Sequence, residues 1–416
     1  MSSCARPRCR PRFLLALVTA VVTSLTGAEA ALAEPQRSNA GTVPTPADDP
    51  FYRPPTPLPP GEPGDVIRSR QIAVRVEPTG IAPVPVAAWQ VLYRSTSATG
   101  KPIAVTGTVL VPRVPWLAGT RPLVSYAVGT HGLGDQCAPS YKMRAGTENE
   151  VALIAQPLMR GWAVVLTDYP ALGTPDVHHY AVGRAAGQAM LDAARAAQRL
   201  PGPGLSPSGP VGFWGYSQGG QAAAFAGELQ PSYAPELKTV GAVAGGVPRD
   251  LIKLARYVDG GPFFGLALGA IAGYRSAYPD LPYDELVNDK GRKLVAQAGE
   301  DCVATMAVRG AFHRLVDLTT VPDVLENPAW RARLTENRPG QRKPTAPVLL
   351  YHGDLDELIP YHIARPLLDD YCRLGATVEW KTMPVSEHIS GDVVGAPVAV
   401  NWLANRFLGT PAGSSC

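Results

Sequence analysis

A serine stands between glycines in the motif Gly215-Tyr216-Ser217-Gln218-Gly219. The motif follows an apolar run at residues 211–214 and precedes an alanine-rich stretch, as where a strand turns sharply into a helix. Small residues two positions either side of the serine allow the two backbones to pass closely. The turn holds the hydroxyl above the sheet at a helix N-terminus, whose dipole favours negative charge. The pattern predicts that Ser217 is a nucleophile, with a structural serine as the alternative.

A serine hydroxyl attacks a carbonyl efficiently only when a base removes its proton, so a histidine and an orienting carboxylate should also be present. With a nucleophile in this kind of turn, the chain order is serine, acid, histidine. The segment HGDLDE at residues 352–357 follows an apolar run and offers three carboxylates. Asp356 is predicted to be the acid, with Asp354 in reserve because its place after a glycine suits a turn residue. Glu357 is expected to cap the helix that follows.

Of the seven histidines, only His388 falls between the last predicted strand, residues 378–383, and the last predicted helix, residues 394–407. An imidazole has an unperturbed pKa of about 6.5, so it can accept the serine proton and return it to a leaving alcohol. His388 is therefore predicted to be the general base. The alternative is that it is an ordinary polar surface residue.

Attack on a carbonyl creates an oxyanion that needs backbone N–H donors. One donor is predicted to be the amide of Gln218, directly after the nucleophile. The other is expected from the glycine-rich loop at residues 129–134, where Thr130 is the best candidate. The alternative is that this loop is an ordinary flexible connection.

The rest of the chain must bring these residues together. From residue 121 onward, short apolar runs alternate with helical stretches. This alternation predicts an α/β fold with a mostly parallel sheet covered on both faces, preceded by antiparallel hairpin strands. The predicted strands are residues 71–76, 89–95, 103–111, 123–128, 163–168, 211–215, 240–246, 348–351 and 378–383, and the predicted helices are residues 150–160, 187–200, 218–229, 364–374 and 394–407.

Changes in composition divide the chain into segments. Residues 1–33 are predicted to be a signal peptide, and the proline-rich residues 34–64 an extended lead-in. Residues 65–247 and 347–416 are predicted to form the core. Residues 248–346 have helical character and few strand signals, so we expect a lid or cap over the ligand-binding edge of the sheet. A helical embellishment packed on the rim is the alternative.

The N-terminus has the order of a secretory signal, with alternating arginines from Arg6 to Arg12, an apolar run at residues 13–25 and small residues up to Ala33. The apolar run is shorter than the roughly 20 residues that span a bilayer. A secreted protein with no transmembrane segment is therefore expected. The 38 basic and 35 acidic side chains nearly cancel, and no dense basic run follows the first dozen residues, which argues against a nucleic-acid partner. A monomer is expected.

Four cysteines remain beyond the predicted signal, namely Cys137, Cys302, Cys372 and Cys416. Four cysteines in an oxidising compartment favour two disulfides, with three possible pairings. The sequence contains no Cys-x-x-Cys or Cys-x-x-His spacing among them and no His-Glu-x-x-His, so no metal site is predicted.

Taken together, the motifs resemble the secretory lipase family, of the Candida antarctica lipase A type with actinobacterial relatives. The resemblance runs over essentially the whole chain beyond the signal. The matching stretches are Asp49-Pro50-Phe51-Tyr52, Cys137-Ala138-Pro139-Ser140, Asp168-Tyr169 with Gly173, Gly215 to Gly220, Asp356 to Tyr361, and Glu387-His388.

The resemblance implies an α/β-hydrolase core with an inserted helical lid, and hydrolysis of triacylglycerols and related esters without a cofactor. It places the family's catalytic triad on Ser217, Asp356 and His388, and its disulfides between Cys137 and Cys302 and between Cys372 and Cys416. The chain departs from the yeast members, which have an acidic side chain near the oxyanion hole where this loop has Gly129-Thr130-His131.

The function predicted from these features is hydrolysis of lipid esters, at or near a lipid–water interface, through an acyl-enzyme on Ser217. An acyltransferase or a peptidase could use the same residues, because the fold does not determine the acyl donor. A catalytically inactive lipid-binding protein is the alternative from a different class.

Overall fold

The computed structural model describes residues 43–82 and 84–416. The predicted signal peptide, residues 1–33, and the first part of the lead-in lie outside the described residues. In the described part of the chain, no helix is both long enough and apolar enough to cross a membrane.

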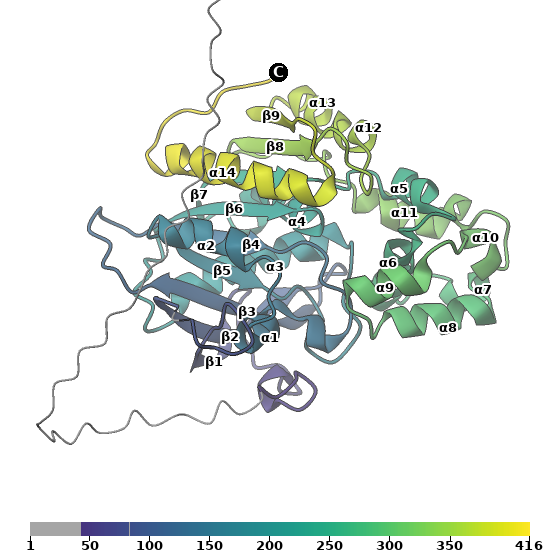
Figure 1. The fold of residues 1–416 in the computed structure, drawn as a ribbon, viewed down its shortest axis with the longest axis horizontal. Coiled ribbons are helices and arrows are strands. Elements are labelled where there is room, and N and C mark those ends of the chain that lie inside the picture. Colours follow the sequence, from purple (N-terminus) through teal and green to yellow (C-terminus); the bar gives the residue numbers. More distant parts are fainter. Residues whose placement is uncertain (1–42, 83) are drawn as a thin grey trace, which may run out of the picture. The chain divides into compact units, whose positions relative to one another are not determined.

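Nine strands form one sheet in the described part of the chain, in the order β1-β2-β3-β5-β4-β6-β7-β8-β9 (Figure 1). The first three pair antiparallel, β3 pairs antiparallel with β5, and the remaining pairs are parallel. This confirms the predicted α/β class. The strands are β1 (Val66–Ile72), β2 (Val86–Thr96), β3 (Pro102–Pro112), β4 (Leu123–Ala127), β5 (Ala163–Thr167), β6 (Pro210–Tyr216), β7 (Lys238–Gly245), β8 (Val348–Gly353) and β9 (Val378–Met383).

Helices cover both faces of the sheet, which is why its central strands are continuous apolar runs. β4 and β5 are buried along their whole lengths. α2 (Val151–Met159) and α14 (His388–Phe407) pack together on one face, and α3 (Gly183–Arg199) and α4 (Gln218–Tyr233) pack together on the other (Figure 1). α1 (Pro139–Ala145) follows β4, while α12 (Tyr361–Ala364) and α13 (Pro366–Arg373) follow β8.

Several predicted boundaries were wrong, two of them by five residues or more. The first strand begins at Val66, five residues before the predicted start. The last helix begins at His388, six residues before the predicted start, so His388 lies in the first helical turn and not in a loop. The cause is a capping box in which the Glu387 side chain accepts the backbone N–H groups of Ile389 and Ser390, and the Ser390 hydroxyl accepts that of Glu387.

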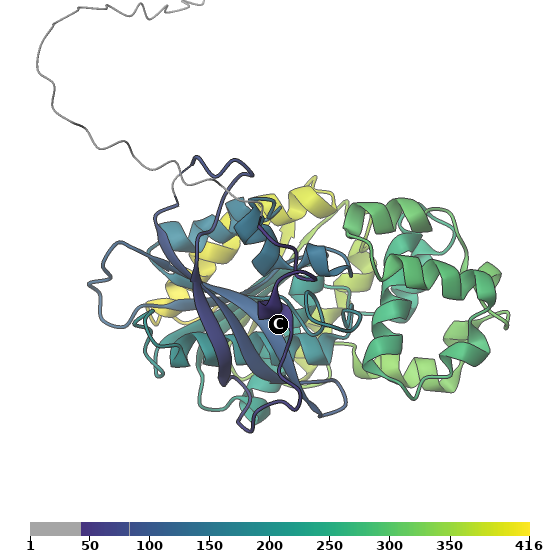
Figure 2. The ribbon, with the colours of Figure 1, turned by 90° about the horizontal axis from the view of Figure 1, so that it is seen from below.

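Between β7 and β8 the described chain is helical, and these helices form a separate group beside the end of the sheet (Figure 2). We call this group the helical cap. It has its own apolar core, which includes the buried side chains of Phe264, Tyr274 and Met306. The helices of the cap are α5 (Leu251–Val258), α6 (Phe264–Ala277), α7 (Tyr283–Leu286), α8 (Asp289–Ala298), α9 (Val303–Gly310), α10 (Leu315–Leu318) and α11 (Pro328–Glu336).

Two disulfides join distant parts of the chain, with the pairing that the family resemblance implied. Cys137 pairs with Cys302, which links the segment after β4 to the start of α9 in the cap. Cys372 pairs with Cys416, which links α13 to the C-terminal residue. The described part of the lead-in is also anchored, because Phe51 and Tyr52 are buried in a small apolar cluster that includes Cys137.

Three buried carboxyls should make the stability of the fold depend on pH. Burial raises the pKa values of Asp168 and Asp192 to about 6 and that of Glu228 to about 7. An acid with a raised pKa in the folded state stabilises the fold below its unfolded pKa and loses this contribution as the pH rises through its folded pKa. These three groups should therefore each lower the free energy of unfolding by about 3 kcal/mol between about pH 4 and pH 7. The buried His178 and His179 act in the opposite direction, because burial lowers their pKa values to about 3 and about 4.

Urea unfolding at pH 5 and pH 8 measures this effect. The free energy of unfolding at pH 8, relative to that at pH 5, should be higher in Glu228→Gln than in the wild type, because one of the three titrating carboxyls is removed. A pH dependence of stability that is the same in Glu228→Gln and in the wild type would contradict the expectation for this group.

Candidate active site

Ser217 occupies a sharp turn between β6 and α4, as the glycine spacing predicted. Its φ is 57° and its ψ is −120°, a left-handed conformation that costs energy for any residue other than glycine. The Ser217 N–H donates to the Gly245 carbonyl at 3.0 Å. A Cβ atom on Gly219 would clash with the Ala127 carbonyl, and one on Gly220 would clash with the Gly245 carbonyl. Glycine is therefore required at both positions for the strand and the helix to pack.

Asp356 and His388 are joined by a buried hydrogen bond, in which imidazole Nδ1 donates to Asp356 Oδ2 at 2.7 Å. The other carboxylate oxygen, Oδ1, accepts the backbone N–H groups of Leu358 at 3.0 Å and Ile359 at 2.7 Å. The carboxylate is thus held in one orientation by its own loop. This loop geometry leaves the second oxygen free to orient the imidazole.

The two neighbouring carboxylates have other roles. Asp354 is exposed in the turn after β8, where its side chain accepts the Ser386 N–H at 3.2 Å. Glu357 was expected to cap the helix after Pro360. Its side chain instead accepts the His388 N–H at 3.0 Å, and no described side chain caps that helix. The helix that Glu357 was expected to cap lies next to it in the sequence. The fold instead brings the start of α14 to this side chain.

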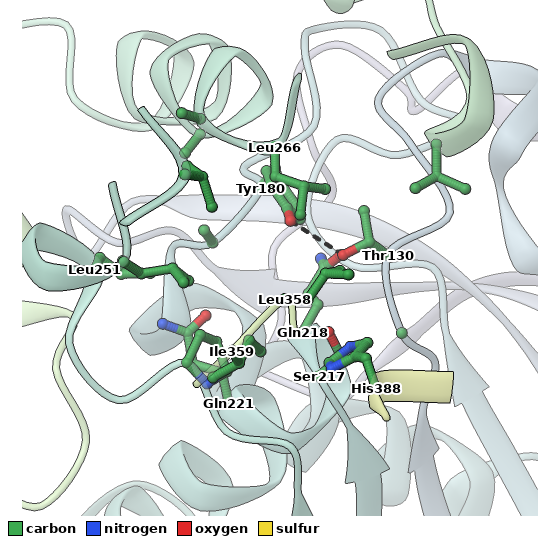
Figure 3. A pocket seen from close by; sticks show the side chains of 18 of the residues that line it. Thr130, Tyr180, Ser217, Gln218, Gln221, Leu251, Leu266, Leu358, Ile359 and His388 are labelled. Carbon is green, nitrogen blue, oxygen red and sulfur yellow. Dashed lines mark hydrogen bonds between the residues drawn. The ribbon is translucent and has the colours of Figure 1, made fainter. Parts of the chain in front are cut away.

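Ser217 and His388 lie next to each other at the wall of one cavity (Figure 3). Because Nδ1 faces Asp356, Nε2 is the imidazole nitrogen left to interact with a substrate or with the serine. Among the described residues the Ser217 hydroxyl makes no hydrogen bond, and its side chain is partly exposed to the cavity. Catalytic hydrogen bonds are often loose in the absence of a ligand and tighten when the substrate binds.

The two predicted oxyanion donors also line this cavity. Gln218 is the first residue of α4, and its side-chain amide is 2.8 Å from Nε2 of the buried His178. The Thr130 hydroxyl is 3.1 Å from the hydroxyl of Tyr180 (Figure 3). A Cβ atom on Gly129 would lie 3.9 Å from Ser217 Cβ, so the loop after β4 runs beside the nucleophile. The structure brings all five predicted residues to one site, and their catalytic roles remain predictions.

The cavity has a volume of about 480 Å³ and extends from this site into the helical cap. Its walls are mainly apolar and come from several cap helices, including α5, α6 and α11. Leu251, Leu266, Ala270 and Trp330 are among the cap residues that line it. A cavity of this volume with mainly apolar walls suits an apolar chain whose polar end lies at Ser217.

Several residues of the site had little or no signal in the sequence. Glu150 and Asp392 line the cavity from the segment before α2 and from α14, and Tyr180 lines it beside Thr130. His352 lies behind the triad, where its Nε2 donates to the Ile359 carbonyl at 2.8 Å and lies 3.3 Å from Asp356 Oδ2. Burial lowers the pKa of His352, although Asp356 opposes the shift, so the imidazole is neutral at neutral pH. The one feature of the sequence that could have suggested a role for His352 is its position at the end of a predicted strand.

The mostly parallel sheet, the strained serine turn after β6, the acid in the loop after β8 and the histidine at the start of α14 define an α/β-hydrolase. A model of the secretory lipase family matches residues 139–415. The chain therefore belongs to the secretory lipase family, whose members are carboxylic ester hydrolases, as the resemblance in the sequence implied.

Individual relatives agree over most of their lengths. A probable inactive lipase of Mycobacterium tuberculosis is 36% identical over 381 residues, covering 88% of this chain and 83% of the relative. A secreted triacylglycerol lipase of Malassezia globosa is 30% identical over 413 residues, covering 95% of this chain and 88% of the relative. Candida antarctica lipase A in its closed state superposes with a TM-score of 0.80 at 26% identity, covering 90% of this chain and 89% of the lipase.

Proposed function

We propose that the protein is a secreted serine hydrolase that cleaves carboxylic esters of lipids, with Ser217 as nucleophile, His388 as general base and Asp356 as the orienting acid. The observation that carries the proposal is the Asp356–His388 hydrogen bond beside Ser217, at the wall of an apolar cavity. The membership in the secretory lipase family supports it.

In the proposed reaction His388 Nε2 takes the Ser217 proton as the hydroxyl oxygen attacks the ester carbonyl. The negative charge that forms on the carbonyl oxygen is stabilised by backbone N–H groups, of which we assign one to Gln218 and one to Thr130. The ester C–O bond then breaks, the imidazolium gives its proton to the leaving alcohol, and an acyl-enzyme remains. Water, deprotonated by the same imidazole, releases the fatty acid and restores the serine.

The cavity supports a lipid acyl group as the substrate part that is bound. Ile389 and Val393 line the cavity and are also exposed by 66% and 56%, so the rim of the site is apolar as well as its interior. Burying apolar surface contributes about 0.8 kcal/mol per methylene group. A substrate presented at a lipid–water interface would contact this rim as its acyl chain enters.

Substitution of a cavity wall residue should shorten the preferred acyl chain. Ala270→Phe adds a ring to the partly exposed cap wall. If the ring excludes about three methylene groups of the substrate from the cavity, each costs about 0.8 kcal/mol of binding. The value of kcat/KM for long-chain esters should then fall roughly fiftyfold. Hydrolysis of p-nitrophenyl acetate and palmitate measures the ratio, and acetate hydrolysis serves as the internal control. Equal losses on both esters would show that the cap does not hold the acyl chain.

A substrate panel tests the proposed function. The purified protein should hydrolyse p-nitrophenyl esters and emulsified triolein, and a phosphonate that labels active serines should modify the peptide that contains Ser217. Activity confined to short soluble esters would make the protein an esterase that does not act on lipid interfaces. Acyl transfer to an added alcohol, or cleavage of peptide amides, would assign the acyltransferase or peptidase alternative.

A catalytically inactive lipid-binding protein is the second candidate, because one close relative is named a probable inactive lipase. This chain has a serine, an acid–histidine pair and a cavity in the arrangement that hydrolysis requires. Binding of fatty acid without hydrolysis and without phosphonate labelling would favour the second candidate.

The secretory family and a secreted relative support an extracellular location. We propose in addition that residues 1–33 are a cleaved signal peptide and that the mature protein acts as a monomer without a cofactor. N-terminal sequencing of the exported protein and its elution mass test the first two points.

A further inference from the structure

Two glutamates that precede α2 make contact with the loop after β4. Glu150 Oε1 accepts the Gly129 N–H at 2.7 Å, and its Oε2 accepts the Tyr126 hydroxyl at 2.5 Å. Glu148 Oε1 is 2.7 Å from His131 Nε2. Thr130, the assigned oxyanion donor, is the residue between the two contacts. The loop is therefore held on both sides of Thr130 by carboxylates from one short segment.

The His131 ring is held between two groups that can only accept hydrogen bonds. Its Nδ1 lies 3.0 Å from the Gly129 carbonyl, and its Nε2 faces the Glu148 carboxylate. Both contacts are satisfied as hydrogen bonds to acceptors only when both ring nitrogens carry protons, so this geometry favours the imidazolium form of His131. The ring is 3% exposed. Glu148 also accepts the Glu150 N–H at 3.0 Å, so the two glutamates and the histidine form one connected unit.

We propose that Glu148 and Glu150 are positioning residues that hold the Gly129–His131 loop in the conformation in which the Thr130 N–H stabilises the oxyanion. The inference rests on the proposed function. A donor aimed in advance at the developing charge lowers the barrier because no reorganisation is needed when the charge appears. Glycine at position 129 makes the loop flexible by itself, so external contacts must supply the rigidity.

The charged groups around Glu148, Glu150 and His131 should make the anchoring of the Gly129–His131 loop depend on pH. Although burial alone would lower it, Glu148 and Glu150 raise the pKa of His131, and Lys142 of α1 opposes them. Asp392 of α14 faces Glu150, and burial together with Glu150 raises the pKa of Asp392 well above its usual value. Deprotonation of His131 at alkaline pH removes a donor from one of its two contacts, so the loop loses an anchor and activity should fall.

The experiment compares Glu148→Gln and Glu150→Gln with the matched control Glu228→Gln. Glu228 of α4 has the same kind of partners, because its Oε1 accepts the Gly340 N–H at 2.6 Å and the Tyr371 hydroxyl at 2.9 Å. It does not line the cavity. Each variant is assayed for kcat and KM on a soluble p-nitrophenyl ester, for the pH dependence of kcat and for binding of a trifluoromethyl ketone that forms an oxyanion with Ser217.

In both site variants we expect kcat to fall about tenfold to a hundredfold and KM to change less than threefold. The loss in kcat should be smaller than when an oxyanion donor is removed altogether, because the Thr130 N–H is still present. Affinity for the trifluoromethyl ketone should fall by the same factor as kcat. In Glu148→Gln the alkaline limit of kcat should move down by on the order of one pH unit, because His131 loses its opposite charge. Glu228→Gln should change none of these.

The proposal is overturned if the site variants keep the kcat and the ketone affinity of the wild type, while Ser217→Ala is inactive. It is also overturned if kcat falls equally in Glu228→Gln, since the effect would then be a loss of general stability. If either site variant does not fold, the pH dependence of ketone binding to the wild type decides, because binding that is constant through the alkaline limit excludes a role for the His131–Glu148 pair. Wild-type protein that hydrolyses no ester would instead refute the proposed function, and the inference with it.

Discussion

Ser217→Ala should reduce ester hydrolysis to background, with kcat lowered by about 10⁵-fold to 10⁶-fold, as is found when the nucleophile of a serine hydrolase is removed. No acyl-enzyme forms without the hydroxyl, and only binding and oxyanion stabilisation remain. The fold should be unaffected, because the hydroxyl makes no hydrogen bond in the described part of the chain and alanine occupies less space than serine. Hydrolysis of p-nitrophenyl butyrate and the thermal unfolding midpoint are the two measurements.

Ser232→Ala is the matched control for this variant. Ser232 lies on the same helix, α4, and among the residues that the structure describes its hydroxyl donates a hydrogen bond only to the Leu229 carbonyl, at 3.3 Å. The control should keep its activity within a factor of two and remain open to phosphonate labelling. Residual activity of Ser217→Ala above one per cent of the wild type would remove the nucleophile assignment, whatever the behaviour of Ser232→Ala.

Asp356→Asn should lower kcat by about 10⁴-fold, the effect that the same change has in a serine protease triad. An asparagine oxygen can still accept the N–H groups of Leu358 and Ile359, so the loop should keep its conformation. The amide then presents a donor to His388 Nδ1, which favours the tautomer with its proton on Nε2. That tautomer cannot accept the serine proton.

Asp354→Asn is the comparison that decides between the two candidate acids. Within residues 43–82 and 84–416 the Asp354 side chain accepts only one hydrogen bond, from the Ser386 N–H, and asparagine can accept the same bond. We expect kcat within threefold of the wild type for this variant and an unchanged pH profile. A large loss in Asp354→Asn with normal kcat in Asp356→Asn would transfer the acid role to Asp354.

The local features of the site could be predicted from the sequence. The turn at Ser217 depends on steric contacts between residues that are close in the chain, because the backbone passes too closely for side chains at Gly219 and Gly220. The alternation of apolar runs and helical stretches likewise specified a parallel α/β sheet. The expected order of nucleophile, acid and histidine limited the candidates to a few side chains. The cysteine count allowed three pairings, and only the family resemblance selected the pair of disulfides that the structure contains.

The contacts between distant segments were decided by the tertiary structure. Asp354 and Asp356 are two residues apart in one turn, and only the approach of α14 places His388 against one of them. Glu148 and Glu150 lie in a segment without a recognisable motif, and reach the oxyanion loop because α2 packs beside β5. Short-range steric contacts and hydrophobic periodicity are determined by residues that are close in the chain. The partner of a buried charge depends instead on how whole helices and strands pack together.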